Sequence, residues 1–296
     1  MAQAPVVYGV STRPPRGDYS LACADYTCDQ NWTSYRDHEH ALFARLYERQ
    51  QRQLPGQACD EFIAALGGLD LQRGIPHFED VSARLRRATD WEIVAVPGLI
   101  PESAFFSLLA ARRFPVTVWL RRPEEFDYIV EPDVFHDLFG HVPLLFDPVF
   151  ADYMQAFGRG GLKAHGLQAL EFLARLYWYT VEFGLIQSPH GLRVYGAGIL
   201  SSASETVYSL SDPRPARLAF DLQRVLRTPY RIDEFQDPYF VVASFQQLFE
   251  ATAPDFTPLY RQISGMPVLP MAPLPGEHAY AANPRPDNVQ QPTDGC

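Results

Sequence analysis

The sequence contains few cysteines, and their placement gives them no evident structural role. Its four cysteines form no C-x-x-C pair and lie toward the two ends of the 296-residue chain, so neither a zinc ribbon nor a disulfide framework is indicated. No apolar run approaches the roughly 18 to 20 residues that a membrane span needs. The N-terminus has neither a basic start nor an apolar signal core. These absences predict a soluble protein of the cytoplasm with no membrane partner.

Basic residues are also scarce. Lys and Arg number 25 against 35 Asp and Glu, which gives a formal net charge of −10. Binding to nucleic-acid phosphates needs a basic surface, so the balance argues against a nucleic-acid partner. There is no P-loop and no G-x-G-x-x-G after a strand. Hydrophobic residues make up 47% of the chain and aromatic residues 13%, which is typical of a globular protein with a substantial core.

The periodicity of apolar residues predicts a mostly α fold with a small β component. In the segment 115–122, Thr117, Trp119 and Arg121 alternate with apolar residues and should share one face of a strand. Residues 194–210 are rich in glycine and are predicted to be a connection. The predicted helices span 34–54, 61–71, 78–90, 102–114 and 167–183, and the predicted strands span 92–100 and 115–122.

Three regions are predicted along the chain. Residues 1–30 form an irregular N-terminal arm, residues 31–265 a single catalytic domain, and residues 266–296 a proline-rich tail. The tail contains seven prolines and no periodic pattern, so it is expected to be extended or disordered. It also lacks the heptads of an oligomerisation helix, which predicts a monomer.

The stretch HDLFGH places His136 and His141 five positions apart. On an ideal α-helix such residues point about 140° apart. Gly140 permits an irregular backbone, and Pro143 disfavours helix at the residue before it. The pair is therefore predicted to lie at or near a helix end, where distortion brings the two rings together. Asp133 is placed to cap that helix or to accept a hydrogen bond from an imidazole.

The spacing alone leaves two interpretations open: hydrogen-bonded core histidines, or metal ligands. Two imidazoles with one carboxylate and open positions are typical of non-haem iron(II) oxygenases, whereas a closed set of four ligands indicates zinc. Glu182 is a candidate carboxylate because it lies in an apolar helix, where a buried glutamate needs a compensating partner. On an ideal helix it shares a face with Trp178 and Ala174. Most helix glutamates face solvent, however.

Longer motifs carry a resemblance. The stretches EPDVFHDLFGHVPLL, YWYTVEFGL, VYGAGILSSASE and EFQDPYFVVASF occur in this order, and with them the chain resembles the pterin-dependent aromatic amino acid hydroxylases. The resemblance extends from the first helix to about residue 250 and is nearest to bacterial members that consist of the catalytic domain alone. It implies helices around a central iron cleft. It also implies the hydroxylation of L-phenylalanine to L-tyrosine by O2, with Fe(2+) and a tetrahydropterin as cosubstrate.

The same resemblance assigns roles to residues, none of them catalytic beyond the iron ligands. The implied iron ligands are His136, His141 and Glu182. On the implied substrate side, Arg121 binds the substrate carboxylate and Asp133 holds that arginine. The residues of this side are Arg121, Asp133, Tyr128, Trp178, Gly198, Ser201 and Ser202. The implied pterin side consists of Val96, Gly98, Ile100, Phe105, Ala174 and Tyr177.

Three positions depart from the pattern of the animal enzymes. Asp137 replaces a glutamate, Glu102 replaces a serine in the pterin loop, and Ile129 replaces a threonine in the substrate loop. Two alternatives to phenylalanine hydroxylation stay open. One is a tryptophan or tyrosine hydroxylase of the same family, because apolar pockets distinguish similar rings weakly. The other is a non-catalytic protein whose histidines hold structural zinc.

Overall fold

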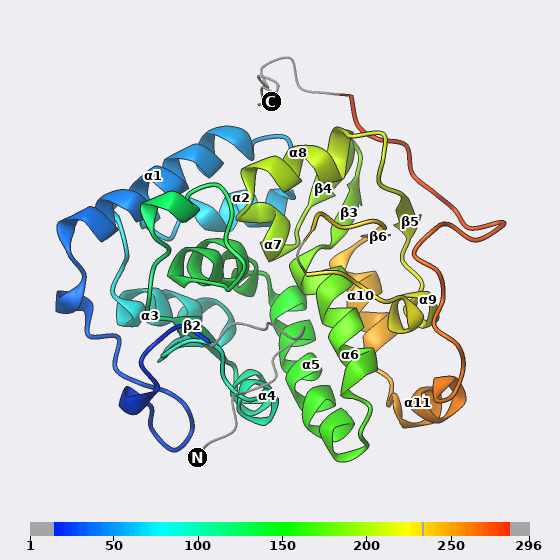
Figure 1. The fold of residues 1–296 in the computed structure, drawn as a ribbon, viewed down its shortest axis with the longest axis horizontal. Helices are drawn as coiled ribbons and strands as arrows, with labels where there is room; N and C mark the ends of the chain where they lie inside the picture. The colour runs from blue at the N-terminus through cyan, green and yellow to red at the C-terminus, as the bar shows by residue number, and fades with distance from the viewer. Residues whose placement is uncertain (1–14, 233, 285–296) are drawn as a thin grey trace.

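The computed structural model describes residues 15–232 and 234–284, in which helices pack together with two small sheets (Figure 1). Helices α5 and α6 lie side by side in the centre of the view, and α1 crosses one edge. This arrangement confirms the predicted mostly helical class. The α-helices are α1 (Asp37–Gln53), α2 (Asp60–Leu66), α3 (Phe78–Thr89), α4 (Glu102–Ala110), α5 (Pro148–Gly166), α6 (Leu170–Tyr177), α7 (Ala197–Leu200), α8 (Ala203–Ser211), α9 (Leu222–Arg227), α10 (Phe245–Thr252) and α11 (Thr257–Ile263).

Two sheets complete the architecture. Strands β1 (Glu92–Val96) and β2 (Arg113–Thr117) form a parallel pair in which Val96 is opposite Thr117. The second sheet has the order β4-β3-β6-β5, with β3 antiparallel to β4 and parallel to β6, and β5 parallel to β6. Its strands are β3 (Leu185–Ser188), β4 (Gly191–Val194), β5 (Arg217–Ala219) and β6 (Tyr239–Val242).

Short helical turns connect these elements. The 3-10 turns are η1 (Tyr19–Leu21), η2 (Trp32–Ser34), η3 (Leu71–Arg73), η4 (Pro123–Glu125) and η6 (Val142–Phe146). Two further segments are π-helical, namely η5 (His136–His141) and η7 (Trp178–Glu182). The buried apolar residues of all these elements form one large cluster, with a small second cluster at Val96, Ile100 and Leu108.

The strand predicted at 115–122 is displaced in the structure. Helix α4 ends at Ala110, and Arg112 has a positive φ of 57°, which helices do not tolerate. The strand therefore begins at Arg113 and ends at Thr117, so Arg121 lies beyond it and the predicted face shared with Thr117 and Trp119 was wrong. Both Val116 and Thr117 are buried, because a parallel pair covered on both faces shows no alternation.

The glycine-rich segment 194–210 was predicted to be a connection, and this was also wrong. It holds α7 and most of α8. Gly196 occupies the N-cap of α7, and the Ser202 side chain caps α8 by accepting a hydrogen bond from the backbone N–H of Glu205. The helix predicted at 167–183 begins only at Leu170, because Gln168 has a positive φ of 55°, and its last turn is π-helical.

The described ends of the chain are both attached to the domain. Near the N-terminus, the Arg16 guanidinium pairs with Glu125 at 2.8 Å and lies over the Trp119 ring. Near the C-terminus, residues 266–284 run past β5 without forming a helix or a strand, and the Tyr280 N–H donates to the Arg217 carbonyl at 2.7 Å. Within residues 15–232 and 234–284, no helix is both long enough and apolar enough to cross a membrane.

Candidate metal centre and cavity

The six residues HDLFGH form one π-helical segment, η5. A π-turn is closed by i→i+5 hydrogen bonds, so residues five apart lie nearly above one another. The Nε2 atoms of His136 and His141 are accordingly 3.1 Å apart. Asp133 caps the segment by accepting the His136 backbone N–H at 3.0 Å. A Cβ atom on Gly140 would lie 2.9 Å from the Ala197 carbonyl oxygen, so glycine lets α7 pack directly on this turn.

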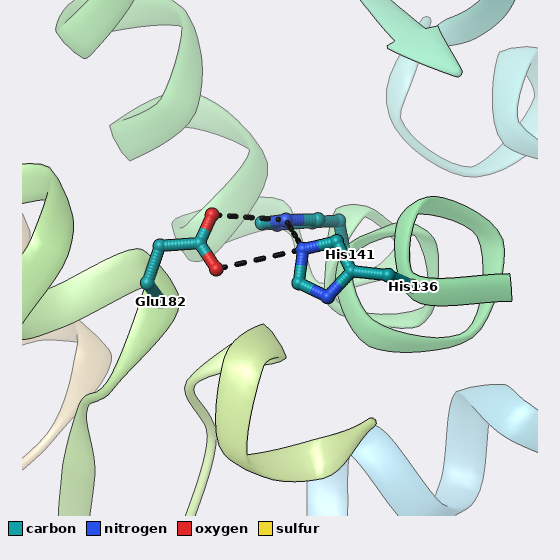
Figure 2. A group of neighbouring side chains, drawn as sticks. All are labelled: His136, His141 and Glu182. Atoms are coloured by element: carbon teal, nitrogen blue, oxygen red, sulfur yellow. Dashed lines mark hydrogen bonds and ion pairs between the residues drawn. The ribbon is translucent and has the colours of Figure 1, made fainter. Parts of the chain in front are cut away.

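Glu182 ends the other π-helical segment, η7, and its carboxylate faces both imidazoles (Figure 2). Its oxygens lie 3.5 Å from His136 Nε2 and 3.2 Å from His141 Nε2. The possible ligand atoms of the three residues all lie within 4.8 Å of one another. Among the residues that the structure describes, this is the one group of three or more His, Cys, Asp or Glu side chains placed to hold a metal.

The protonation states suit metal binding. Ser201 Oγ donates to the Ala197 carbonyl at 2.8 Å, so it accepts from His136 Nδ1–H at 2.9 Å, which leaves the lone pair on His136 Nε2. Burial lowers the pKa of His136 to about 4, so this imidazole is neutral near pH 7. Burial by itself raises the pKa of Glu182, but His141 and His136 outweigh it, and the net shift is downward. Imidazole nitrogen and carboxylate oxygen are the donors that a divalent transition metal prefers.

The three side chains lie at the wall of a cavity of about 280 Å³. On one side, the cavity is lined by the loop after β1 and by residues of α4 and α6. Phe105 and Tyr177 meet there edge to face, with ring centroids 5.8 Å apart. Of the residues assigned to the pterin side, those that line the cavity are Val96, Gly98, Ile100, Phe105 and Tyr177. Ala174 is not among the lining residues.

The N-terminal arm supports this loop. Tyr19 Oη donates to the Leu99 carbonyl at 2.8 Å. A Cβ atom on Gly98 would lie 2.5 Å from the Arg16 carbonyl oxygen, so the arm and the loop are in direct contact. The loop that lines the cavity is therefore fixed from both sides, by the arm and by α4.

Arg121 and Asp133 form a buried pair on the other side of the cavity. Arg121 Nε and Nη2 donate to the two Asp133 oxygens at 2.8 and 2.9 Å. Burial alone raises the pKa of Asp133, but the Arg121 charge and its hydrogen bonds outweigh this and hold the pKa below its ordinary value. Arg121 Nη1 has no hydrogen-bond partner within the described ranges, and Arg121 lines the cavity. Of the other residues assigned to this side, those that line the cavity are Tyr128, Trp178, Gly198, Ser201 and Ser202.

The structure also adds residues that the sequence did not single out. The loop 231–236, whose Asp233 lies outside the described residues, contributes Ile232, Phe235 and Gln236 to the wall, and Glu205 contributes from α8. Part of this loop lies in the stretch EFQDPYFVVASF, but sequence reasoning gave none of its residues a role. The sequence feature that could have indicated this loop is the polar residue Gln236 close to an apolar strand. In the structure Gln236 is 2% exposed.

Two of the three departures from the animal pattern line the same cavity. Asp137 lines it and accepts the Thr117 backbone N–H at 2.7 Å, and burial raises its pKa to about 7. Ile129 also lines the cavity. Glu102 is the first residue of α4, where burial raises its pKa. Glu102 is not a lining residue.

Two imidazoles and one carboxylate on a mostly helical frame, next to an open cavity, are the arrangement of a non-haem iron(II) oxygenase. The family model described as "Biopterin-dependent aromatic amino acid hydroxylase" matches residues 18–258. The chain belongs to this family.

Similar proteins agree with this assignment. The phenylalanine-4-hydroxylase of Ralstonia nicotianae is 59% identical over 244 residues, which cover 82% of this chain and 78% of that protein. The phenylalanine-4-hydroxylase of Chromobacterium violaceum is 57% identical over 260 residues, 88% of this chain and 87% of that protein. The crystal structure of the latter enzyme with iron and phenylalanine bound has a TM-score of 0.84 at 53% identity, and the match covers 90% of this chain and 96% of that one.

Proposed function

We propose that this protein is a phenylalanine 4-monooxygenase, which converts L-phenylalanine to L-tyrosine with O2, Fe(2+) and a tetrahydropterin. The convergence of His136, His141 and Glu182 beside a cavity that also holds Arg121 carries the proposal. Iron is favoured over structural zinc because three ligands face an open cavity, and no fourth His, Cys, Asp or Glu joins them among the described residues.

In this proposal His136 Nε2, His141 Nε2 and one or both Glu182 oxygens hold the metal. When bound, iron with a tetrahydropterin supplies the oxygen-activating chemistry. The remaining work belongs to the protein. Ser201 keeps the His136 lone pair directed at the metal, because its hydroxyl occupies Nδ1.

Arg121 is proposed to bind the carboxylate of the amino acid. Asp133 occupies Arg121 Nε and Nη2 and fixes the plane of the guanidinium, which leaves Nη1 for the substrate. The rings of Trp178 and Phe183, 4.8 Å apart, give the adjacent wall an apolar surface for an aromatic side chain. A substrate held in this way has its ring beside the metal and excludes water from the cavity.

The tetrahydropterin is proposed to bind at the opposite wall. Phe105, in α4, presents an aromatic ring next to Tyr177 that suits stacking on a pterin. The backbone around Gly98, held in place by the N-terminal arm, offers hydrogen-bonding groups to the polar edge of the ring. Two ligands on opposite walls would then both reach the metal.

A metal analysis combined with a product assay tests the proposed function. The purified protein should bind about one iron, and it should form tyrosine from phenylalanine only when a tetrahydropterin is added. Tryptophan and tyrosine should be offered as competing substrates, because apolar pockets discriminate weakly between similar rings. A protein that holds zinc and forms no product under these conditions would refute the proposal.

Removal of a ligand gives a sharper result. We expect His136→Ala and Glu182→Ala each to abolish iron binding and turnover, because two ligands do not retain iron(II) against chelation. His165→Ala serves as a matched control, since His165 lies in the last turn of α5 and outside the three-residue group. Full iron occupancy in either ligand variant would remove the assignment.

Three expectations from the sequence remain proposals: a cytoplasmic location, a monomeric state and a catalytic domain bounded at residues 31 and 265. Cell fractionation, light scattering and limited proteolysis test them in turn.

A further inference from the structure

Glu205 is a buried acidic residue in the cavity wall whose partners are all neutral. It lies in α8 with 6% of its surface exposed. Its Oε1 accepts hydrogen bonds from Tyr239 Oη at 2.9 Å and from the Gln236 backbone N–H at 3.3 Å. Within the described ranges no Arg, Lys or His forms an ion pair with it, whereas Glu125 pairs with the Arg16 guanidinium at 2.8 Å. Burying a carboxyl group without a cationic partner costs free energy of folding, so the two hydrogen bonds that it accepts are needed to offset that cost.

Gln236 extends this contact toward the cavity. Its side-chain Oε1 accepts from Trp178 Nε1 at 2.8 Å. Its Nε2 donates to the carbonyls of Arg231 and Glu234 at 2.8 and 3.1 Å. Because an indole N–H only donates, the amide oxygen of Gln236 must face Trp178, and the amide nitrogen must face the loop. One side chain thus fixes both the loop 231–236 and the edge of an indole ring.

Trp178 is the first residue of η7, the segment that ends in Glu182. Its ring stacks on Tyr230 at a centroid distance of 4.5 Å and contacts Phe183 at 4.8 Å. These neighbours restrain the faces of the indole, and among the described residues it is Gln236 that accepts the hydrogen bond of its N–H. The position of this ring and of the loop therefore depends on Gln236, and Gln236 is anchored by Glu205.

We infer that Glu205 is a positioning residue which, through Gln236, sets the place of Trp178 and the loop 231–236 and thereby determines which aromatic amino acid fits the cavity. This inference rests on the proposed function. In the proposed pterin wall, Phe105 and the loop after β1 are on other elements and take no part in this hydrogen-bond chain, while Tyr177 is the last residue of α6, directly before Trp178. Disturbing Glu205 should therefore change amino-acid binding and selectivity without changing pterin binding.

The test compares Glu205→Leu with Glu205→Gln. The leucine variant removes Oε1, the acceptor of both hydrogen bonds. We expect the KM for phenylalanine to rise about tenfold. The ratio of kcat/KM for phenylalanine to that for tryptophan should change by about tenfold. The KM for tetrahydropterin and the iron content should stay within about twofold of the wild type. The glutamine variant keeps an oxygen at Oε1 that can accept both bonds, so it should restore the wild-type ratio to within about threefold.

Gln236→Leu removes the second link, should shift the ratio like Glu205→Leu, and replaces that variant if it does not fold. An unchanged ratio in a folded leucine variant overturns the inference. Equal rises in both KM values with a lower Tm also overturn it, because they indicate a general loss of structure. So does a glutamine variant as impaired as the leucine variant, which would mean that the carboxylate charge contacts the substrate itself.

Failure of the proposed function is recognised separately. If the wild type forms no tyrosine, near-ultraviolet circular dichroism still tests the positioning, with Trp178→Phe identifying the signal of Trp178. That signal should be lost in Glu205→Leu and kept in Glu205→Gln. Equal spectra for these two variants would overturn the positioning role whatever the reaction.

Discussion

Among individual residues, Arg121 combines a proposed role in substrate binding with a role in stability. Arg121 and Asp133 have side-chain exposures of 2% and 0%, and each neutralises the other. Asp133 also accepts the His136 backbone N–H, so the pair connects the candidate carboxylate-binding group to the start of the π-segment that carries two candidate metal ligands. Removing the arginine therefore leaves an uncompensated buried carboxylate close to the metal centre.

We expect Arg121→Ala to raise the KM for phenylalanine by about 100-fold, because a charge-assisted bond to the substrate carboxylate is lost. The same change should lower the free energy of unfolding by about 3 to 5 kcal/mol, because Asp133 stays buried without its partner. Steady-state kinetics and urea unfolding measure the two effects. The double variant Arg121→Ala with Asp133→Asn should recover part of the stability but not the KM. An unchanged KM in Arg121→Ala would remove the carboxylate-binding role.

The pKa of Glu205 gives a prediction about pH. Burial raises it to about 7, above the value of about 4.5 expected in the unfolded chain. The folded state thus binds the proton more tightly, so this contribution to stability is present below about pH 4.5 and is lost as the pH rises through 7. Glu205→Gln does not titrate. The free energy of unfolding of this variant, minus that of the wild type, should therefore increase by about 2 to 3 kcal/mol as the pH rises from about 5 to about 8. Parallel curves from urea unfolding would contradict the raised pKa.

Individual site residues were predictable from sequence to different degrees. The structure brings His136, His141 and Glu182 together, as the resemblance carried by the flanking motifs implied. Such long motifs are specific to a family and so indicate which distant segments meet in its fold. The strand argument for Arg121 failed, since its side chain is placed by Asp133 and not by a strand. Glu205 and Gln236 went unnoticed because the choice of a hydrogen-bond partner across the fold leaves no periodic trace in the sequence.

Among the elements, the long amphipathic helices were the most predictable. Helices α1 and α3 fall within the predicted ranges 34–54 and 78–90, because one face of each buries a regular row of apolar residues. Helix α7 was missed because it is four residues long and is held by packing on η5. Segment η5 was foreseen only as a distortion near Gly140, and η7 was predicted as part of a regular helix, since no residue preference distinguishes a π-turn from the end of a helix.

Gly140→Ala tests the contact between η5 and α7. The new Cβ would lie 2.9 Å from the Ala197 carbonyl oxygen and 3.0 Å from the Ala197 Cβ, so one element must move. We expect a loss of about 1 to 3 kcal/mol in the free energy of unfolding and weaker retention of iron during dialysis against a chelator. Gly160→Ala in α5 is the matched control, because a Cβ there meets nothing within 4 Å. That variant should be more stable by up to about 1 kcal/mol. Equal behaviour of the two variants would contradict the close packing.

For the whole molecule, the described part of the proline-rich segment contributes to the domain through Arg224. This residue of α9 is 5% exposed and donates to the carbonyls of Pro270 and Ala272 at 2.7 and 3.0 Å. It also pairs with Glu277 at 2.6 Å. The predicted boundary at residue 265 separates Arg224 from all three of these groups.

A chain that ends at residue 265 should therefore be less stable than the full chain by about 2 to 4 kcal/mol, because the buried Arg224 guanidinium keeps Thr228 Oγ1 but loses the two carbonyls and the carboxylate of the removed segment. Thermal unfolding of the two chains measures the difference. Glu277→Gln in the full chain keeps the two carbonyl contacts and should lose only a fraction of that amount. A truncated chain with the Tm of the full chain would place the boundary of the folded unit where the sequence put it.

The two π-turns have a consequence for how related chains are compared. A π-turn holds one residue more than an α-turn, so the ligand positions depend on a count of residues and not only on side-chain identity. Deleting any one residue between His136 and His141 would leave an i, i+4 pair, the spacing of zinc-binding helices, and would shift everything after it by one place. Substitutions at Leu138 or Phe139 disturb only packing. A homologous sequence that aligns with a gap inside these six residues is therefore expected to lack this arrangement of the two histidines, however similar the rest of it is.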